Sequence, residues 1–154
     1  MHRYLLKPTA ALRGAAALPA SKSICNRALL LARLAGDGWT VENPSDCDDT
    51  RALVRGLATT GGTVDVGAAG TAMRFLTVWL CTQAGRHVIT GSPRMLERPI
   101  GILVDALRRL GARVAYVGRE GYPPLCIEGG ALRGGAVDVA ASVSSQYISA
   151  LLMV

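Results

Sequence analysis

Runs of apolar residues separated by glycine turns predict a chain in which helices and strands alternate. Glycines at positions 36, 38, 61, 62 and 111 follow three of the apolar runs and are typical of helix ends. Helices are therefore expected at residues 22–34, 48–60, 71–83 and 98–110. Strands are expected between them at residues 39–42, 63–66, 87–90 and 113–117, with two further candidates at 125–128 and 136–139. This alternation predicts an α/β fold.

The order of the elements repeats along the chain. Superposing Arg27 on Arg74 also aligns the glycines and valines that follow each helix, which indicates two copies of one unit. Superposing Gly70 on Ser145 aligns a third helix start. The sequence ends at Val154, inside this third helix, so we expect a fragment that lacks part of its third unit.

Composition narrows the class of partner. The chain has 17 basic and 11 acidic residues, a net charge of +6, and its only lysines are Lys7 and Lys22. Arginine pairs with carboxylates and phosphates, which is compatible with anionic substrates or nucleic acid. No run of five basic residues occurs and aromatic residues do not alternate with the arginines, which disfavours nucleic acid.

The cysteines and histidines do not indicate a metal or disulfide site. Four widely spaced cysteines without a CxxC pair are expected to be reduced structural thiols. His2 and His87 are far apart, and the acidic residues near position 48 are explained by the dipole of the helix that begins there. These residues therefore predict no metal site. No signal sequence or membrane-length apolar run is present, which predicts a cytoplasmic protein.

Three predicted helices begin with small or polar residues, which is the chemistry of an anion site. A helix N-terminus offers unpaired N–H groups and a partial positive charge. If the repeats are related by pseudo-symmetry, these ends converge, although serine at such a position is also an ordinary cap. The three starts are Ser21-Lys22-Ser23, Ala69-Gly70-Thr71 and Ser144-Ser145-Gln146.

Charged side chains near these starts favour the anion interpretation. Lys22 opposes the dipole of its own helix, a conflict that an anionic ligand resolves. Arg27 lies about one turn further on, and Arg74 holds the corresponding position in the second copy. Arg98 precedes a proline that stiffens its loop, which makes it a better ligand candidate than Arg94.

Five motifs resemble the signatures of the 5-enolpyruvylshikimate-3-phosphate synthase family, in that family's order and over nearly the whole chain. The matching segments are Leu18-Pro19-Ala20-Ser21-Lys22-Ser23 with Asn26-Arg27-Ala28-Leu29, Ala69-Gly70-Thr71-Ala72-Met73-Arg74, Arg94-Met95 with Glu97-Arg98-Pro99-Ile100-Gly101 and Leu103-Val104-Asp105-Ala106-Leu107, Gly121-Tyr122-Pro123-Pro124-Leu125, and Ser142-Val143-Ser144-Ser145-Gln146. Ala20, Ala68 and Phe75 depart from the family pattern, which usually has Gly, Asn and Pro there.

The resemblance implies transfer of the enolpyruvyl group from phosphoenolpyruvate to the 5-hydroxyl of shikimate 3-phosphate, without a cofactor. It implies two domains of three βαβαββ units each, an inside-out α/β barrel, of which residues 1–154 are an incomplete first domain. It also implies a monomer when full length, and a fragment that is inactive alone because the proton-transfer groups lie mainly in the second domain.

The resemblance also assigns the site residues, with Lys22 as the catalytic candidate. Shikimate 3-phosphate would be held by Lys22, Ser23, Arg27, Ser144, Ser145 and Gln146. Phosphoenolpyruvate would be held by Lys22, Gly70, Arg98 and Gln146.

Three other interpretations remain open on the sequence. The first is the related transferase that acts on UDP-N-acetylglucosamine, and the second is a basic module that binds nucleic acid. The third is a folding fragment without ligand affinity. Salt dependence of binding would separate nucleic acid from a small anion.

Overall fold

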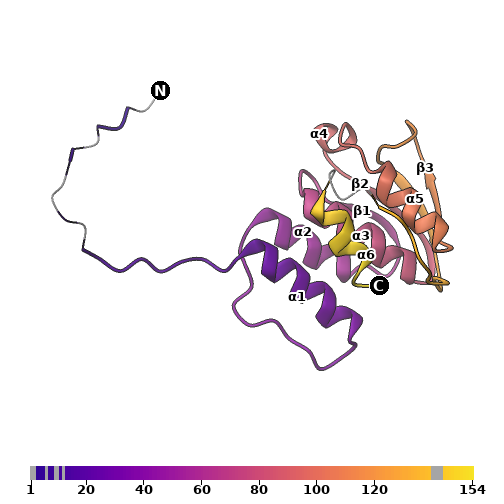
Figure 1. The fold of residues 1–154 in the computed structure, drawn as a ribbon, viewed down its shortest axis with the longest axis horizontal. Helices are drawn as coiled ribbons and strands as arrows, with labels where there is room; N and C mark the ends of the chain where they lie inside the picture. The colour runs from indigo at the N-terminus through magenta and orange to yellow at the C-terminus, as the bar shows by residue number, and fades with distance from the viewer. Residues whose placement is uncertain (1–2, 6, 9–10, 12, 140–143) are drawn as a thin grey trace.

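The computed structural model describes residues 3–5, 7–8, 11, 13–139 and 144–154. Within them the chain mixes helices and strands as the sequence pattern predicts, although two helices precede the first strand (Figure 1). The elements in chain order are α1 (Lys22–Leu34), α2 (Asp48–Leu57), β1 (Gly62–Asp65), α3 (Gly70–Thr82), β2 (Gly85–Thr90), α4 (Pro93–Leu96), α5 (Gly101–Arg109), β3 (Arg113–Tyr116), β4 (Leu125–Gly129) and α6 (Ser145–Leu151).

The four strands form one mixed sheet in the order β1-β2-β4-β3. β1 and β2 run parallel, with α3 as the crossover between them, whereas β4 is antiparallel to both β2 and β3. The run from β1 to β4 is therefore one complete βαβαββ unit, with α3 and α5 as its helices. This confirms the predicted α/β class and its unit.

Helix α3 lies at the centre of the packing. Its residues are buried from Gly70 to Cys81, a pattern that belongs to a helix surrounded by other elements. It contacts α1, α2, α5 and α6 as well as β2 and β4. Figure 1 shows α1 and α2 on one side of α3 and α6 running across it. The side chains of Met73, Phe75, Leu76 and Leu80 are fully buried and form the middle of the core.

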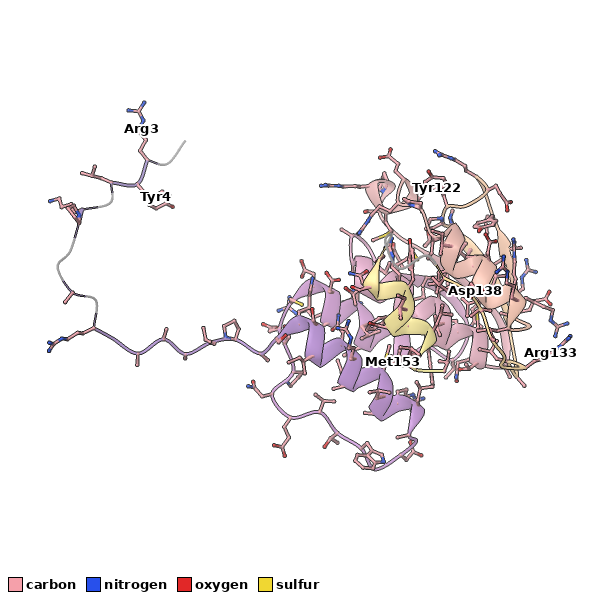
Figure 2. The ribbon with its side chains drawn as sticks, in the orientation of Figure 1. Arg3, Tyr4, Tyr122, Arg133, Asp138 and Met153 are labelled. Carbon is pink, nitrogen blue, oxygen red and sulfur yellow. The ribbon has the colours of Figure 1, made fainter. Side chains whose placement is uncertain are left out.

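The described residues before α1 lie away from this packed body. Figure 2 shows Arg3 and Tyr4 far from the helices and the sheet. Tyr4 is 88% exposed and Leu18 is 87% exposed. These apolar side chains therefore make no contribution to the core.

The strand predicted at residues 39–42 is absent, and the packing gives the reason. In the complete unit β2 lies between β1 and β4, so both of its edges are paired. After α2, residues 58–69 lead through β1 into α3, whereas residues 110–144 after α5 include the antiparallel pair β3 and β4. The first unit has no such pair, and residues 39–42 run extended or bent at the surface, with Trp39 70% exposed.

The prediction of a strand at residues 136–139 is also wrong. Val137 and Val139 are half-buried while Ala136 and Asp138 are exposed, so the alternation seen in the sequence is real. In the described part of the chain this segment has no strand partner, and its valines instead face α6 and Leu110 across a hollow.

Two predicted helices differ in their bounds. The helix expected at 48–60 ends at Leu57, because Thr59 bonds back to the carbonyls of Arg55 and Gly56 in its last turn. The helix expected at 98–110 begins at Gly101, because the residue before a proline is disfavoured in helical conformation. Arg98 therefore lies in a turn between α4 and α5.

A glycine fixes the distance between α3 and the sheet. A Cβ at Gly129 would overlap the carbonyl oxygens of Leu80 and Gln83 at the end of α3. The N–H of the next residue, Gly130, donates to the carbonyl of Cys81 at 2.9 Å. Since these atoms are backbone, a side chain at position 129 would force α3 away from β4.

We expect Gly129→Ala to lower the free energy of unfolding by about 2 kcal/mol or more, because overpacking against backbone cannot relax locally. Gly130→Ala is the matched control. A Cβ there meets nothing within 4 Å, so the change should be below about 1 kcal/mol. Urea denaturation followed by circular dichroism measures both, and equal effects of the two substitutions would contradict this account.

Candidate functional site

The first turns of α1, α2 and α3 meet at Asp49. Its Oδ2 lies 3.8 Å from Nζ of Lys22, at the start of α1. Its Oδ1 accepts a hydrogen bond of 3.2 Å from the N–H of Thr71, in the first turn of α3. The structure therefore brings the starts of α1 and α3 together, as the sequence predicts, and adds that of α2.

The conflict between Lys22 and the dipole of α1 is eased in part by a protein group, since Asp49 lies beside Lys22. The contact is long, and the Lys22 side chain is 47% exposed. Such a pair contributes about 0–1 kcal/mol, because water screens it. Lys22 therefore retains donors that can reach a ligand.

The guanidinium of Arg98 lies against the start of α3. A Cβ at Gly70 would overlap this guanidinium, with Cζ at 3.0 Å. Only glycine leaves room for so close an approach. Arg98 and the positive end of a buried helix therefore act on the same small region.

Arg94 and Arg98 line a hollow of about 430 Å³ together with Ala68 and Met95. Among the described residues neither arginine forms an ion pair, and Glu97, which lies between them in the sequence, forms none either. The hollow is therefore positively charged and suits a carboxylate or phosphate. The methyl side chain of Ala68 brings no polar group to it.

Arg27 connects α1 to α6. Its guanidinium donates to Oγ of Ser149 at 3.0 Å and to the carbonyl of Ser23 at 2.8 Å. It also lies over the ring of Phe75, at 5.9 Å. Arg27 is only half-buried, so it borders the site while bonded to protein groups, and Ser23 itself is exposed.

Helix α6 begins where the sequence predicts. Ser144 is its N-cap, with Oγ accepting a hydrogen bond of 3.2 Å from the N–H of Gln146. Ser145 is exposed and Gln146 is half-buried. Ser142 and Val143 of the same motif lie outside the described residues.

The structural surroundings of Arg74 and Tyr147 are not found by motif reasoning alone. Arg74 is only 5% exposed. It donates to the carbonyls of Gly70 at 3.1 Å and Pro99 at 3.3 Å. Burial lowers the pKa of Arg74, the neighbouring Tyr147 opposes this shift, and the charge of Arg98 adds to it. Tyr147 directly follows Gln146, the last residue of the fifth motif.

The acidic residues before and at the start of α2 have structural partners. Asp46 and Asp48 both pair with Arg51, Asp46 through a hydrogen bond of 2.9 Å to Nε. The cysteines are free, and burial raises the pKa of Cys81 to about 12. No group of three histidine, cysteine or acidic side chains gathers within the part of the chain that the structure describes. No helix in that part is long and apolar enough to cross a membrane.

Comparisons with known proteins agree with this arrangement. The model of the EPSP synthase (3-phosphoshikimate 1-carboxyvinyltransferase) family matches residues 6–66 and 57–154. A 3-phosphoshikimate 1-carboxyvinyltransferase of Bacteroides fragilis strain YCH46 is 51% identical over 152 residues, which cover 99% of this chain and 37% of that protein. An EPSP synthase structure from Acinetobacter baumannii superposes with a TM-score of 0.81 at 25% identity, over 91% of this chain and 38% of that one.

The comparisons also explain the short connection between α2 and α3. A 3-phosphoshikimate 1-carboxyvinyltransferase of Shewanella denitrificans is 45% identical over an alignment of 180 residues that covers all of this chain. The alignment is thus about 26 residues longer than the 154 residues of this chain. The aligned region of the Bacteroides fragilis protein has no such surplus. The family model breaks and restarts between residues 57 and 66, the place where an antiparallel pair of strands is missing from the first unit.

The chain spans 37% and 42% of the length of these two relatives. The family model nevertheless matches it from residue 6 to residue 154, on both sides of the short connection. The chain belongs to the EPSP synthase (3-phosphoshikimate 1-carboxyvinyltransferase) family.

Proposed function

We propose that the protein that contains this chain transfers the enolpyruvyl group of phosphoenolpyruvate to the 5-hydroxyl of shikimate 3-phosphate. The products are 5-enolpyruvylshikimate 3-phosphate and phosphate. The observation that carries the proposal is the placement of Arg98 against Gly70, at the start of the buried helix α3. The N–H of the following residue, Thr71, donates to Asp49, which also lies beside Lys22. Family membership supplies the reaction, and these residues supply a place for its anions.

In this proposal Lys22, Gly70, Arg98 and Gln146 hold phosphoenolpyruvate. The N–H groups at the start of α3 and the two cations stabilise the carboxylate, the phosphate and the negative charge that grows on the leaving phosphate. Lys22 is the catalytic residue of the set, because it faces both substrates. Orientation of the two anions is the contribution of this chain to the rate.

Shikimate 3-phosphate would occupy the neighbouring space between α1 and α6. Ser23 and Arg27 border it on one side, and Ser144, Ser145 and Gln146 border it on the other. The hydrogen bond between Arg27 and Ser149 supports this assignment, because it holds the two helices at one distance. The ligand would then add contacts to groups that are already placed.

Residues 1–154 are proposed to be part of the first of two domains. The reaction needs a base for the attacking hydroxyl and an acid for the methylene carbon. The motifs of this chain supply neither group. From the same resemblance we propose a cytoplasmic protein that is monomeric when full length and needs no cofactor.

We expect shikimate 3-phosphate to shift the amide resonances of residues 22–27 and 144–146 when it is titrated into the 154-residue chain. Lys22→Met should weaken this binding about tenfold or more, because a charge-assisted hydrogen bond is lost. Lys7→Met removes the same charge from an exposed residue before α1 and should leave the affinity unchanged. No shifts at millimolar ligand would contradict the proposal that this chain holds the anion.

Gly70→Ala should weaken phosphoenolpyruvate binding about tenfold, because its methyl group displaces the Arg98 guanidinium. Gly118→Ala serves as the control, since a Cβ there meets nothing within 4 Å. Calorimetric titration of both variants with phosphoenolpyruvate, in the presence of shikimate 3-phosphate, measures the difference. Equal affinities would show that the contact of Gly70 with Arg98 does not serve binding.

The purified 154-residue chain should release no phosphate from the two substrates, because the proton-transfer groups are absent from its motifs. A colorimetric phosphate assay over hours tests this expectation. A native-like rate of release would refute it and would require an acid and a base within this chain.

A further inference from the structure

The carbonyl oxygen of Pro99 receives hydrogen bonds from two different helices. The hydroxyl of Tyr147, in α6, donates to it at 2.7 Å. The guanidinium of Arg74, in α3, donates to it at 3.3 Å. Pro99 directly follows Arg98, and Tyr147 directly follows Gln146, so this carbonyl lies between the backbones of two candidate ligand residues.

Arg74 and Tyr147 also contact each other. The Arg74 guanidinium lies 5.8 Å from the centre of the Tyr147 ring, a favourable distance for a cation above an aromatic face. Tyr147 is 3% exposed and Arg74 is 5% exposed, so water screens these contacts little. In the part of the chain that the structure describes, Arg74 has no acidic partner within ion-pair distance, so carbonyl oxygens and the ring hold its charge.

Helix α6 depends on such contacts for its position. Helix α6 (Ser145–Leu151) packs on α3 and α5, so its neighbours set its position. The hydrogen bond from Tyr147 to Pro99 ties its first turn to the Arg98 loop, and the bond from Arg27 to Ser149 ties its second half to α1. The first of these links sets the distance between Gln146 and Arg98.

We propose that Tyr147 is a positioning residue for the anion site, acting through its hydroxyl on the carbonyl of Pro99. The ring fills the space beside Arg74, and the hydroxyl fixes Arg98 and Gln146 relative to each other. A phenylalanine would keep the packing and lose the link. The functional part of this inference rests on the function proposed above, whereas the link itself is a property of the unliganded fold.

The test is Tyr147→Phe in the 154-residue chain, with Tyr4→Phe as the matched control. Tyr4 loses the same hydroxyl but is 88% exposed and lies outside the packed body. Tyr147→Phe should move the carbonyl carbon resonance of Pro99 and the amide resonances of Arg98 and Gln146. It should weaken phosphoenolpyruvate binding about threefold to tenfold, the range for one buried neutral hydrogen bond. The melting temperature should change little, and the control should change none of these quantities.

The two proposals fail in different ways. An unmoved Pro99 carbonyl resonance overturns the link, whether or not the chain binds phosphoenolpyruvate. A moved resonance with unchanged affinity overturns the positioning role. If the unsubstituted chain binds neither substrate while the resonance moves in Tyr147→Phe, the link is supported and the binding proposed for this chain alone is refuted.

Discussion

The complete burial of α3 is the constraint on which the rest of the structure depends. A helix that is covered on all sides needs neighbours all round, and α1, α2, α5, α6 and the sheet supply them. Two of its polar residues find partners inside the protein, whereas the indole N–H of Trp79 has none among the described residues. Thr77 bonds to the carbonyl of Met73 in the preceding turn, and Arg74 bonds to the carbonyls of Gly70 and Pro99.

The burial also explains where the candidate site lies. The first N–H groups of a helix have no partner within it, and in a buried helix water cannot satisfy them all. One side chain, Asp49, accepts from Thr71, and the Arg98 guanidinium lies close to Gly70. The start of α3 is therefore where buried backbone donors and cations meet, which is the chemistry that an anion needs.

The order of helices and strands could be predicted because it depends on local pattern. Lys22–Leu34 was predicted to the residue, and the other helices differ by a few positions where prolines or turn residues decide the end. The segment 39–42 was mispredicted because a strand needs a neighbour, and no local feature of residues 39–42 records that the pair after α2 is missing. Apolar alternation gave the same error at 136–139.

The candidate site likewise contains residues that the sequence marks and residues that only the fold reveals. Lys22, Gly70 and Arg98 stand out in the sequence because helix starts and prolines mark them. The roles of Asp49, Arg74 and Tyr147 depend on contacts between residues far apart in the chain, such as the hydrogen bond from Tyr147 to Pro99. Composition and spacing carry no trace of such contacts. Arg74 stands out in the sequence as the counterpart of Arg27, whereas Tyr147 has no signal beyond its place after Gln146.

The short connection between α2 and α3 has a consequence for how this family is built. The first unit keeps both helices and passes straight into β1, and α1 still joins α2 through the buried hydrogen bond of 2.7 Å from Thr50 to Asn26. Its two helices, packed on α3, are thus retained in the described residues although the strand pair after α2 is absent. The strand pair of one repeat can therefore be lost while the helix starts of the candidate site stay together, so length differences among relatives need not report differences in chemistry.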